Sequence, residues 1–352
     1  MNKKRLLHVL PSSVGGVNTI LREIISGTAD NYDITVFIVC GCKNVDKLVE
    51  EKIQIVRLNQ KHFLSFRMIW ELICLIKKND IIHVHLFPTF YLCAILKPFF
   101  AKKTFIYTEH ASVNNRRKYN ILRYIEIPIY KLYNDVIAVS DSCKINLEIW
   151  LRYKVHVQTI NNGIDVKKYD SQFRFDFESV GIDAQYVVTM VARLSTDKDF
   201  YTIIRAMSLL SSDYHLVFVG DGDLRSQIED EIRGLSLTDK ITLLGYRIDV
   251  AEILASSTLS VLSTYAEGMG LVILESLAVG IPCIGSDVEG VRDVLPDSYR
   301  FERGNIAELA ALIERVVENK IEVLPYNDIL KKYSVEKMVS SYRELYNNSL
   351  SN

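Results

Sequence analysis

The feature that most constrains this chain is a glycine-rich loop between an apolar strand and an apolar helix. The run from Thr258 to Leu262 predicts a strand, and Glu267-Gly-Met-Gly270 then opens a segment rich in Leu, Ile and Ala. Glycines let a ligand approach the backbone closely, and the unpaired N–H groups at a helix start attract an anion. The loop therefore predicts an anion site in an α/β fold.

A glutamate lies on each side of this predicted anion site, at Glu267 and Glu275. Carboxylates repel an anion, but they accept hydrogen bonds from hydroxyl groups attached to it. If the helix begins near Gly270, Glu275 lies ~6–8 Å along its axis, whereas Glu267 precedes the helix. A diphosphate between two hydroxylated rings, as in a nucleotide sugar, fits this arrangement. Two solvated helix carboxylates are the alternative interpretation.

Short apolar runs alternate with helical patterns along the whole chain, which predicts parallel, doubly wound sheets. The 352 residues are enough for two domains. A polar, irregular stretch between Asn161 and Gly181 predicts the linker between them. The expected parts are residues 1–168, 169–333 and a final helix in 334–352.

The net charge of −1 conceals an asymmetry between the two halves. Residues 1–170 carry 25 Lys and Arg against 15 Asp and Glu, whereas residues 171–352 carry 17 against 28. This favours an anionic partner such as a membrane surface or a lipid phosphate for the first half, with unevenly distributed solvated charge as the alternative. No nucleic-acid partner is expected.

Compartment signals are consistent with a cytoplasmic protein. The six cysteines include no CxxC pair and fit buried, reduced thiols. The apolar run Leu6–Leu10 is too short for a signal peptide. The run Leu86–Phe100 contains Pro88, Lys97 and Pro98 and is too short to span a bilayer.

Two cations follow the strand predicted over Gln185–Ala192, at Arg193 and Lys198. Cations on a strand-to-helix loop suit a diphosphate. Two DxD patterns, one at Asp197 and Asp199 and the other at Asp221 and Asp223, could instead hold a metal ion with a diphosphate. The first encloses Lys198 and the second lies in a glycine turn, so we expect no metal.

Histidines cluster near predicted strand ends in the first half. His83 and His85 share one face of a strand, and Glu109-His110 ends the next one, where sites in such sheets lie. A metal site would need further His and Asp ligands, so hydrogen-bonded histidines are favoured. Gly15 and Gly16 form a strand-to-helix turn that faces phosphate in many α/β sheets. A tight turn without a ligand is equally compatible, because no GxGxxG follows.

Basic residues lie before and within an aromatic helix predicted over Tyr119–Tyr133, with a kink at Pro128. This segment predicts either an acceptor-phosphate or membrane patch, or a core helix with snorkelling cations. The cations of the predicted patch are Arg116, Arg117, Lys118 and Arg123.

With these residues in view, the chain resembles the family 4 retaining glycosyltransferases of GT-B fold over nearly its whole length. The motifs that carry the resemblance are Gly15-Gly16-Val17, Asp80-Ile-Ile-His-Val-His85, Glu109-His110, Ala138-Val-Ser140, Asn162-Gly-Ile-Asp165, Val191-Ala-Arg193 through Lys198, Val219-Gly-Asp-Gly222, Leu244-Gly245 and Glu267-Gly-Met-Gly-Leu-Val-Ile-Leu-Glu275.

The resemblance implies two Rossmann-like domains facing a central cleft. The first would bind a glycan acceptor and the second a nucleotide-sugar donor, and the last helix would return to the first domain. Arg193 and Lys198 would neutralise the diphosphate in place of a metal. Glu267 would bind sugar hydroxyls, Glu275 the ribose, and His110 would act near the anomeric carbon. The other implied donor-binding residues are Gly15, Gly16, Gly220, Tyr246, Arg247, Ile248, Gly268, Met269, Gly270 and Leu271.

Departures from the family pattern are confined to short segments. The family's Gly-Gly-x-x-Glu loop is replaced by Asp287-Val-Glu289-Gly290, and His110 is followed by Ala111 instead of Asp. Three other functions fit the sequence less well. A UDP-sugar 2-epimerase would need a carboxylate such as Glu109, a nicotinamide dehydrogenase lacks its GxGxxG, and a non-catalytic subunit would have lost its charged motif residues.

The sequence therefore predicts a retaining glycosyltransferase that moves a hexose or N-acetylhexosamine from an NDP-sugar, expected to be UDP-linked. The expected acceptor is a growing bacterial surface glycan on a lipid carrier, which rests on the basic first half and on family analogy. We expect no cofactor, and possible peripheral contact with the inner face of an anionic cytoplasmic membrane.

Overall fold

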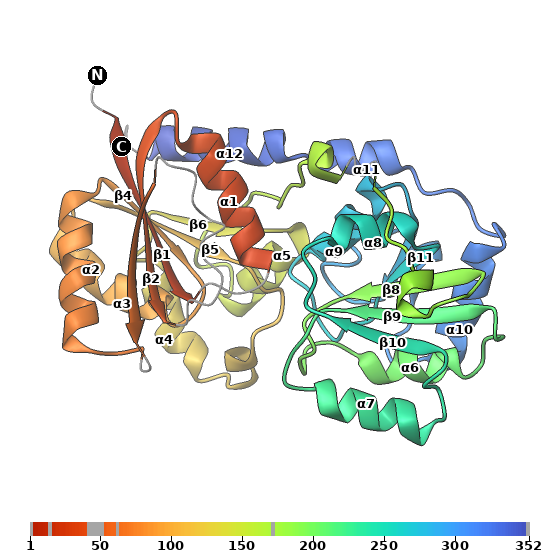
Figure 1. Ribbon diagram of the computed structural model, residues 1–352. Coiled ribbons are helices and arrows are strands. Elements are labelled where there is room, and N and C mark those ends of the chain that lie inside the picture. The colour runs from red at the N-terminus through yellow and green to blue at the C-terminus, as the bar shows by residue number, and fades with distance from the viewer. Residues whose placement is uncertain (1–2, 13–15, 41–52, 61–62, 170–172, 350–352) are drawn as a thin grey trace. The chain divides into compact units, whose positions relative to one another are not determined.

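The computed structural model describes residues 3–12, 16–40, 53–60, 63–169 and 173–349, and it divides into two compact units (Figure 1). The first unit contains residues 1–163 together with 335–352, and the second contains residues 164–334. Each unit has its own parallel sheet with helices packed against it. The predicted pair of doubly wound α/β units is confirmed.

The sheet of the first unit has the strand order β3-β2-β1-β4-β5-β6-β7. Its strands are β1 (Lys4–Ser12), β2 (Tyr32–Cys40), β3 (Gln54–Gln60), β4 (Ile81–His85), β5 (Thr104–Glu109), β6 (Asp135–Ala138) and β7 (Gln158–Thr159). The order reverses between β1 and β4, which creates the switch point where ligands of open α/β sheets bind. The histidine-bearing strands β1 and β4 pair directly, with His8 opposite His83.

Helices of the first unit pack against this sheet through buried apolar residues. They are α1 (Gly16–Thr28), α2 (Phe66–Lys78), α3 (Thr89–Leu96), α4 (Leu122–Tyr130), α5 (Asp141–Trp150) and the C-terminal α12 (Val335–Asn348). Helix α12 contacts α1 and closes against β2, where the Tyr32 hydroxyl donates to Asn347 over 2.7 Å. A Cβ on Gly27 would meet Val339 at 2.4 Å, so only glycine allows this approach.

The second unit has the strand order β10-β9-β8-β11-β12-β13. Its strands are β8 (Tyr186–Val191), β9 (Tyr214–Val219), β10 (Ile241–Gly245), β11 (Leu259–Leu262), β12 (Cys283–Ser286) and β13 (Arg300–Phe301). Here the order reverses between β8 and β11. The loops after these two strands carry the predicted cations and the first glutamate, so they leave the sheet at its switch point.

The helices of the second unit are α6 (Phe200–Met207), α7 (Arg225–Gly234), α8 (Val250–Ser256), α9 (Leu271–Ala278), α10 (Ile306–Val317) and α11 (Tyr326–Lys332). Side-chain caps set several starts, as where Asp199 accepts from the Thr202 amide at the beginning of α6. Within the part of the chain that the structure describes, no helix combines the length and apolarity needed to cross a bilayer.

Some element bounds differ from those that the sequence pattern predicts. Helical periodicity in the sequence extends from residue 62 to residue 78, but α2 begins at Phe66, because the Ser65 hydroxyl accepts from the Met68 amide and caps the helix. The aromatic helix expected over 119–133 is the shorter α4, preceded by a 3₁₀ turn at 115–118. Periodicity locates apolar faces well, but capping decides where a helix begins.

Candidate active site

Two neighbouring loops of the second unit bring the predicted donor-site charges together. The loop after β8 runs beside the loop after β11, and Lys198 forms an antiparallel bridge with Thr264. The Tyr265 amide donates to the Asp197 carbonyl over 3.1 Å, and the Asp199 amide donates to the Ser263 carbonyl over 3.0 Å. These backbone bonds fix the two loops to each other.

Lys198 and Glu267 form a close ion pair at this junction. Nζ of Lys198 lies 2.5 Å from Oε1 of Glu267 and 3.3 Å from Oδ2 of Asp197. The Lys198 and Glu267 side chains are only 13% and 14% exposed. Burial disfavours the ammonium, but the two carboxylates outweigh it and raise the pKa of Lys198. Lys198 is therefore a fixed positive charge at neutral pH.

Arg193 is the more accessible of the two predicted cations. Its Nε donates to Ser195 Oγ over 3.3 Å, and its Nη2 lies 3.9 Å from Oδ1 of Asp197. Burial opposes ionisation of Asp197, but hydrogen bonds from Ser195 and Lys198 lower its pKa overall. Because its side chain is 63% exposed, the Arg193 guanidinium can reorient toward an incoming anion.

Three of the four DxD aspartates have structural partners in this fold. Asp199 caps α6, and Asp197 pairs with the two cations. Asp221 accepts from the Gly222 amide over 2.8 Å and lies 3.8 Å from the Arg225 guanidinium. Both carboxylate oxygens of Asp197 and Asp199, and Oδ1 of Asp221, already have a donor of this chain.

The glycine loop has the shape that its sequence predicts. Gly270 has a φ of 68° and precedes α9 directly. A Cβ there would come within 3.0 Å of Ile273 and of Leu262, so the turn requires glycine. Gly268 directly follows Glu267 in the sequence, so the backbone from Gly268 onward starts at the Lys198–Glu267 pair. This backbone leads into the first amides of α9, the N–H groups of a helix start.

Gly290 packs against the glycine loop, a role that the sequence did not predict. It has a φ of 81°, and a Cβ on it would lie 2.6 Å from the carbonyl oxygen of Glu267. The segment Asp287–Gly290 departs from the family pattern, which therefore predicts no role for it. The positive φ and the close approach show that its glycine shapes the loop that carries Glu267.

Glu275 lies on α9, one turn beyond the glycine loop, and is partly accessible. Its Oε1 accepts a hydrogen bond of 3.1 Å from the Tyr169 hydroxyl. Burial raises the pKa of Glu275, and the Tyr169 bond opposes this in part. Tyr169, at the end of a 3₁₀ turn over Val166–Tyr169, carried no sequence signal of its role.

The other predicted donor residues lie on loops after β9 and β10. Gly220 has a φ of 136°, and a Cβ there would lie 2.0 Å from the carbonyl oxygen of Ala192. This contact places the β9 loop against the backbone that precedes Arg193. Tyr246 and Ile248 are exposed after β10, whereas Arg247 is paired with Asp249 at 2.5 Å.

In the first unit, His110 follows β5 and is partly buried. Its Nε2 lies 3.1 Å from Nδ1 of His85. Burial lowers the pKa of His110 to about 4, so the imidazole is neutral at neutral pH. Gly16 is the first residue of α1, and Gly15 lies outside the described residues.

The predicted cation patch is corrected in part by the structure. Arg116 lies 3.2 Å from Glu126, and Arg117 lies 3.1 Å from Glu109; these two arginine side chains are only 14% and 12% exposed. Both arginines balance buried carboxylates and cannot form an open surface patch. Lys118 is exposed, and Arg123 is half-buried over the Trp150 ring.

The ion pair between Arg117 and Glu109 removes the main support for a 2-epimerase. Glu109 is buried, and one of its oxygens accepts from both Arg117 and the Tyr130 hydroxyl. A carboxylate that acts as a base beside a sugar carbon must be accessible to that carbon. Glu109 is instead a structural anion beneath α4.

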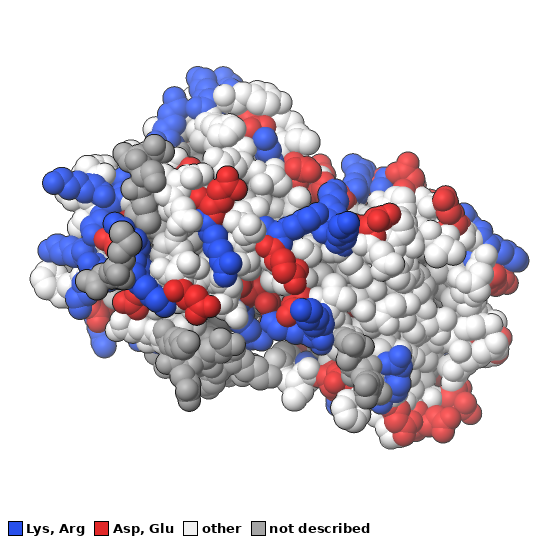
Figure 2. All heavy atoms as spheres, turned by 90° about the horizontal axis from the view of Figure 1, so that it is seen from above, with Lys and Arg blue, Asp and Glu red and all other residues white. Residues whose placement is uncertain are grey.

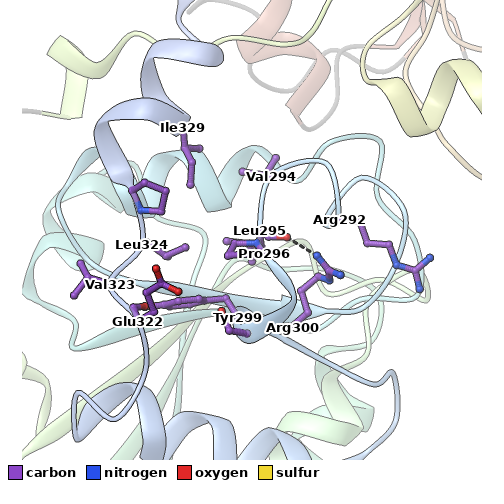
Figure 3. Close-up of a pocket in the computed structure, with 12 residues that line it drawn as sticks. Arg292, Val294, Leu295, Pro296, Tyr299, Arg300, Glu322, Val323, Leu324 and Ile329 are labelled. Atoms are coloured by element: carbon purple, nitrogen blue, oxygen red, sulfur yellow. Dashed lines mark hydrogen bonds between the residues drawn. The ribbon is translucent and has the colours of Figure 1, made fainter.

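A pocket of about 460 Å³ lies elsewhere on the second unit, between the segment after β12 and the start of α11 (Figure 3). Arg300 closes one side by donating to the Leu295 carbonyl over 2.5 Å. Its lining includes none of the predicted donor-binding residues. Lys198 and Glu267, where the sequence predicts the donor site, lie outside this pocket.

Comparisons with known proteins agree with this geometry. Residues 172–336 match the family "Glycosyl transferases group 1", and residues 14–168 match "Glycosyltransferase Family 4". A UDP-Gal:alpha-D-GlcNAc-diphosphoundecaprenol alpha-1,3-galactosyltransferase of Escherichia coli is 26% identical, over 96% of this chain and 90% of that protein. N-acetyl-alpha-D-glucosaminyl L-malate synthase of Bacillus anthracis is also 26% identical, over 76% and 74%.

Solved structures show the same fold. Anabaena Alr3699/HepE, in a complex with UDP and glucose, superposes with a TM-score of 0.83 at 17% identity, covering 98% of this chain and all of that one. Sucrose-phosphate synthase from Thermosynechococcus elongatus gives a TM-score of 0.82 at 18% identity, with 99% and 100% covered. On its fold and on both family matches, the chain belongs to the family 4 glycosyltransferases of GT-B fold and is a glycosyltransferase.

Proposed function

We propose that the enzyme transfers a hexose or N-acetylhexosamine from a UDP-sugar, with retention, to a lipid-linked bacterial surface glycan. One observation carries the donor side of this proposal. Lys198 and Glu267 meet at 2.5 Å on the two loops that leave the switch point of the second sheet, with Arg193 on the first of these loops. A cation for phosphate and a carboxylate for sugar hydroxyls are thereby side by side.

The charges of this junction suit a nucleoside diphosphate without a metal ion. The Lys198 ammonium has three N–H donors, and the two carboxylates near it use two of them. The third can donate to a diphosphate oxygen, and Arg193 can add a bidentate contact. Glu275, on the same helix as the anion-binding turn, is suited to accept from the ribose hydroxyls, and exposed Tyr246 and Ile248 to receive the base.

The step we propose is front-face substitution within an ion pair. The bond from the anomeric carbon to the diphosphate oxygen breaks, and its electron pair leaves with UDP. The acceptor oxygen then attacks the same face and passes its proton to the departing phosphate oxygen. Lys198 and Arg193 stabilise the charge that develops on UDP. Glu267 orients sugar hydroxyls, and neutral His110 acts beside the anomeric carbon.

Retention and the lipid-linked acceptor draw support from the Escherichia coli relative. Its name specifies UDP-galactose, an undecaprenol diphosphate-linked acceptor and an α-1,3 product. An α-linked donor that gives an α-linked product reacts with retention. We extend these features to this chain as a class of donor and acceptor. The cytoplasmic face of the membrane is the proposed location.

A panel of nucleotide sugars tests the donor assignment. Calorimetry and donor hydrolysis should select UDP-linked hexoses or N-acetylhexosamines over other nucleotides. A metal chelator should leave both readouts unchanged, because Arg193 and Lys198 supply the positive charge. Binding of no nucleotide sugar, or a rate that depends on added Mg²⁺, would overturn the proposal.

Contact with an anionic membrane is proposed for an apolar surface of the first unit. We define the α4–α5 surface by the exposed residues Ile121, Tyr124 and Ile125 around α4 and Ile145 and Ile149 on α5. The two helices meet where Trp150 Nε1 on α5 donates to Glu126 on α4 over 2.6 Å. Arg152, just after α5, donates to the Tyr124 hydroxyl over 3.2 Å. Exposed apolar side chains beside cations are typical of an interfacial surface.

The cations that border the α4–α5 surface are suited to lipid phosphate. Lys118 is exposed, Arg123 lies over the Trp150 ring at 4.9 Å, and Arg152 lies over the Tyr124 ring at 5.2 Å. Over the molecular face drawn in Figure 2, acidic and basic side chains are interspersed among the described residues.

Vesicle sedimentation measures this contact. The double variant Ile121→Asp/Ile125→Asp should bind vesicles rich in anionic lipid at least about tenfold more weakly. It replaces apolar side chains that would enter the lipid with negative charges, which the anionic lipid repels. Trp70→Asp is the matched control, since Trp70 is an exposed apolar residue of α2 on the same unit. Equal pelleting of the double variant and the wild type would contradict the proposed membrane contact of the α4–α5 surface.

A further inference from the structure

Four histidines of the first unit form a connected cluster at the switch point of its sheet. His8 lies on β1, His83 and His85 lie on β4, and His110 follows β5. Nδ1 of His8 lies 3.1 Å from Nε2 of His85, and Nδ1 of His85 lies 3.1 Å from Nε2 of His110. A continuous path of imidazoles thus runs from the interior of the sheet to His110.

The cluster could in principle hold a metal ion, since ligand atoms of His8, His83 and His85 lie within 4.8 Å of one another. The hydrogen bonds argue against this use. Both nitrogens of His85 face other histidines, and those of His83 lie 2.7 Å from the Tyr346 hydroxyl and the Thr108 hydroxyl. A metal ligand needs an unshared electron pair directed at the ion. Hydrogen bonding already engages the nitrogens of these two rings.

All four imidazoles are neutral at neutral pH. Burial lowers the pKa of His8 to about 3 and that of His110 to about 4. Burial and the neighbouring histidines lower the pKa of His83 and His85 well below 6.5. A neutral imidazole has one N–H and one bare nitrogen. Each histidine in the path therefore donates through one nitrogen and accepts through the other.

This rule leaves only two arrangements for the path from His8 to His110. In the first, His110 Nε2–H donates to His85, which donates to His8, and His8 Nε2–H is left over. In the second, His8 Nδ1–H donates to His85, His85 Nδ1–H donates to His110, and His8 Nε2 is bare. His8 Nε2 is buried and has no hydrogen-bond partner among the described residues.

The second arrangement is favoured because a buried N–H without an acceptor is rarer in proteins than a buried acceptor without a donor. It has a direct consequence at the other end of the path. His110 accepts through Nε2 and must carry its proton on Nδ1, the nitrogen that does not face His85. His110 then has an N–H donor on Nδ1. The tautomer of His8 determines this, although His85 lies between His8 and His110 on the path.

We propose that His8 and His85 are positioning residues that hold neutral His110 in its Nδ1–H tautomer, so that His110 donates a hydrogen bond to substrate oxygen. The use of that donor rests on the proposed function, whereas the tautomer does not. His83 stands beside the path, between Tyr346 of α12 and Thr108 of β5. It packs against His8 and His85 with ring centroids 5.1 and 4.1 Å away but forms no hydrogen bond with either.

The decisive measurement is the tautomer of His110 in the full-length protein labelled with ¹⁵N-histidine. Two-bond ¹H–¹⁵N spectra distinguish Nδ1–H from Nε2–H, and His110→Gln identifies the signals of His110. In the wild type we expect the proton on Nδ1. In His85→Leu the path is broken, and His110 should become a mixture of tautomers. A wild-type His110 with its proton on Nε2 would overturn the proposal.

Two further variants separate positioning from simple loss of packing. His83→Leu also removes a buried imidazole from β4, but it should leave the His110 spectrum unchanged. His8→Phe keeps an aromatic ring and removes the far end of the path, so it should shift the His110 tautomer toward the mixture. An unaltered His110 spectrum in both His85→Leu and His8→Phe would contradict the path.

Kinetics provide the second readout. His85→Leu should lower kcat in proportion to the fraction of His110 that leaves the Nδ1–H tautomer, up to about tenfold, the factor that one ordinary hydrogen bond is worth, with little change in the donor KM. Zn²⁺ added to the wild type should leave the His8, His83 and His85 signals in place; stoichiometric binding with loss of these signals would overturn the hydrogen-bonded path. If no donor binds at all, the proposed function fails while the tautomer measurement still stands.

Discussion

Replacing Lys198 with alanine should lower kcat by about 100- to 1,000-fold, the usual cost of removing one preorganised group that stabilises developing charge. Lys198 is buried, its pKa is raised, and it lies 2.5 Å from Glu267. The positive charge is therefore held in position before the diphosphate begins to leave. Initial rates at saturating donor measure the effect, and added Mg²⁺ should not restore activity.

Controls distinguish a catalytic role of Lys198 from a purely structural ion pair. Lys240→Ala removes a half-buried lysine of the same unit that only donates to the Met207 and Leu210 carbonyls, so it should leave kcat unchanged. The double variant Lys198→Ala/Glu267→Ala leaves no uncompensated partner of the pair. Recovery of activity in the double variant would mean that the pair only holds the loops together.

Replacing Glu275 with alanine should weaken UDP binding by about 10- to 100-fold, because hydrogen bonds to a charged group are worth about 1.5–3 kcal/mol. The side chain lies on α9 with Tyr169 as its hydroxyl donor, and its other oxygen is suited to a ribose hydroxyl. Titration calorimetry with UDP measures the loss. Glu314→Ala, an exposed carboxylate on α10 of the same unit, should bind UDP like the wild type.

The pH dependence of UDP binding provides an independent check on Glu275. Burial raises its pKa above the ordinary 4.5. Ribose hydroxyls donate best to the ionised carboxylate, so affinity should be constant at pH values well above the raised pKa. It should decrease as the pH falls through that value. Glu275→Gln should bind weakly at every pH and lose this dependence; UDP affinity unchanged in Glu275→Ala would refute the ribose assignment.

Local patterns in the sequence were sufficient to predict the donor side of the fold. The alternation of short apolar strands with helices predicts parallel sheets, since side-chain burial follows the secondary-structure period. The Arg193 and Lys198 loop and the glycine loop each follow a predicted strand. Parallel strands end at one edge of a sheet, so loops after neighbouring strands meet there. The 2.5 Å contact between Lys198 and Glu267 agrees with this reasoning.

Charge along the sequence was a weaker guide, because it does not show which side chains are buried. Arg116 and Arg117 look like part of a surface patch in the sequence, but Glu126 and Glu109 hold them in the interior. Their carboxylate partners lie ten and eight residues away along the chain, with no helical or strand spacing to link them. An arginine can be identified as buried only when its partner is located.

What the sequence by itself determined is the fold class, the order of the elements and the segments of the second unit on which the cations and carboxylates proposed for the donor site lie. Only the tertiary structure decided that Gly290 supports the Glu267 loop, that Tyr169 donates to Glu275, and that His8 connects to His110 through His85. These contacts join residues that are between 23 and 106 positions apart in the chain. Local spacing fixes the face of an element on which a side chain lies, whereas strand order and loop packing choose its neighbour.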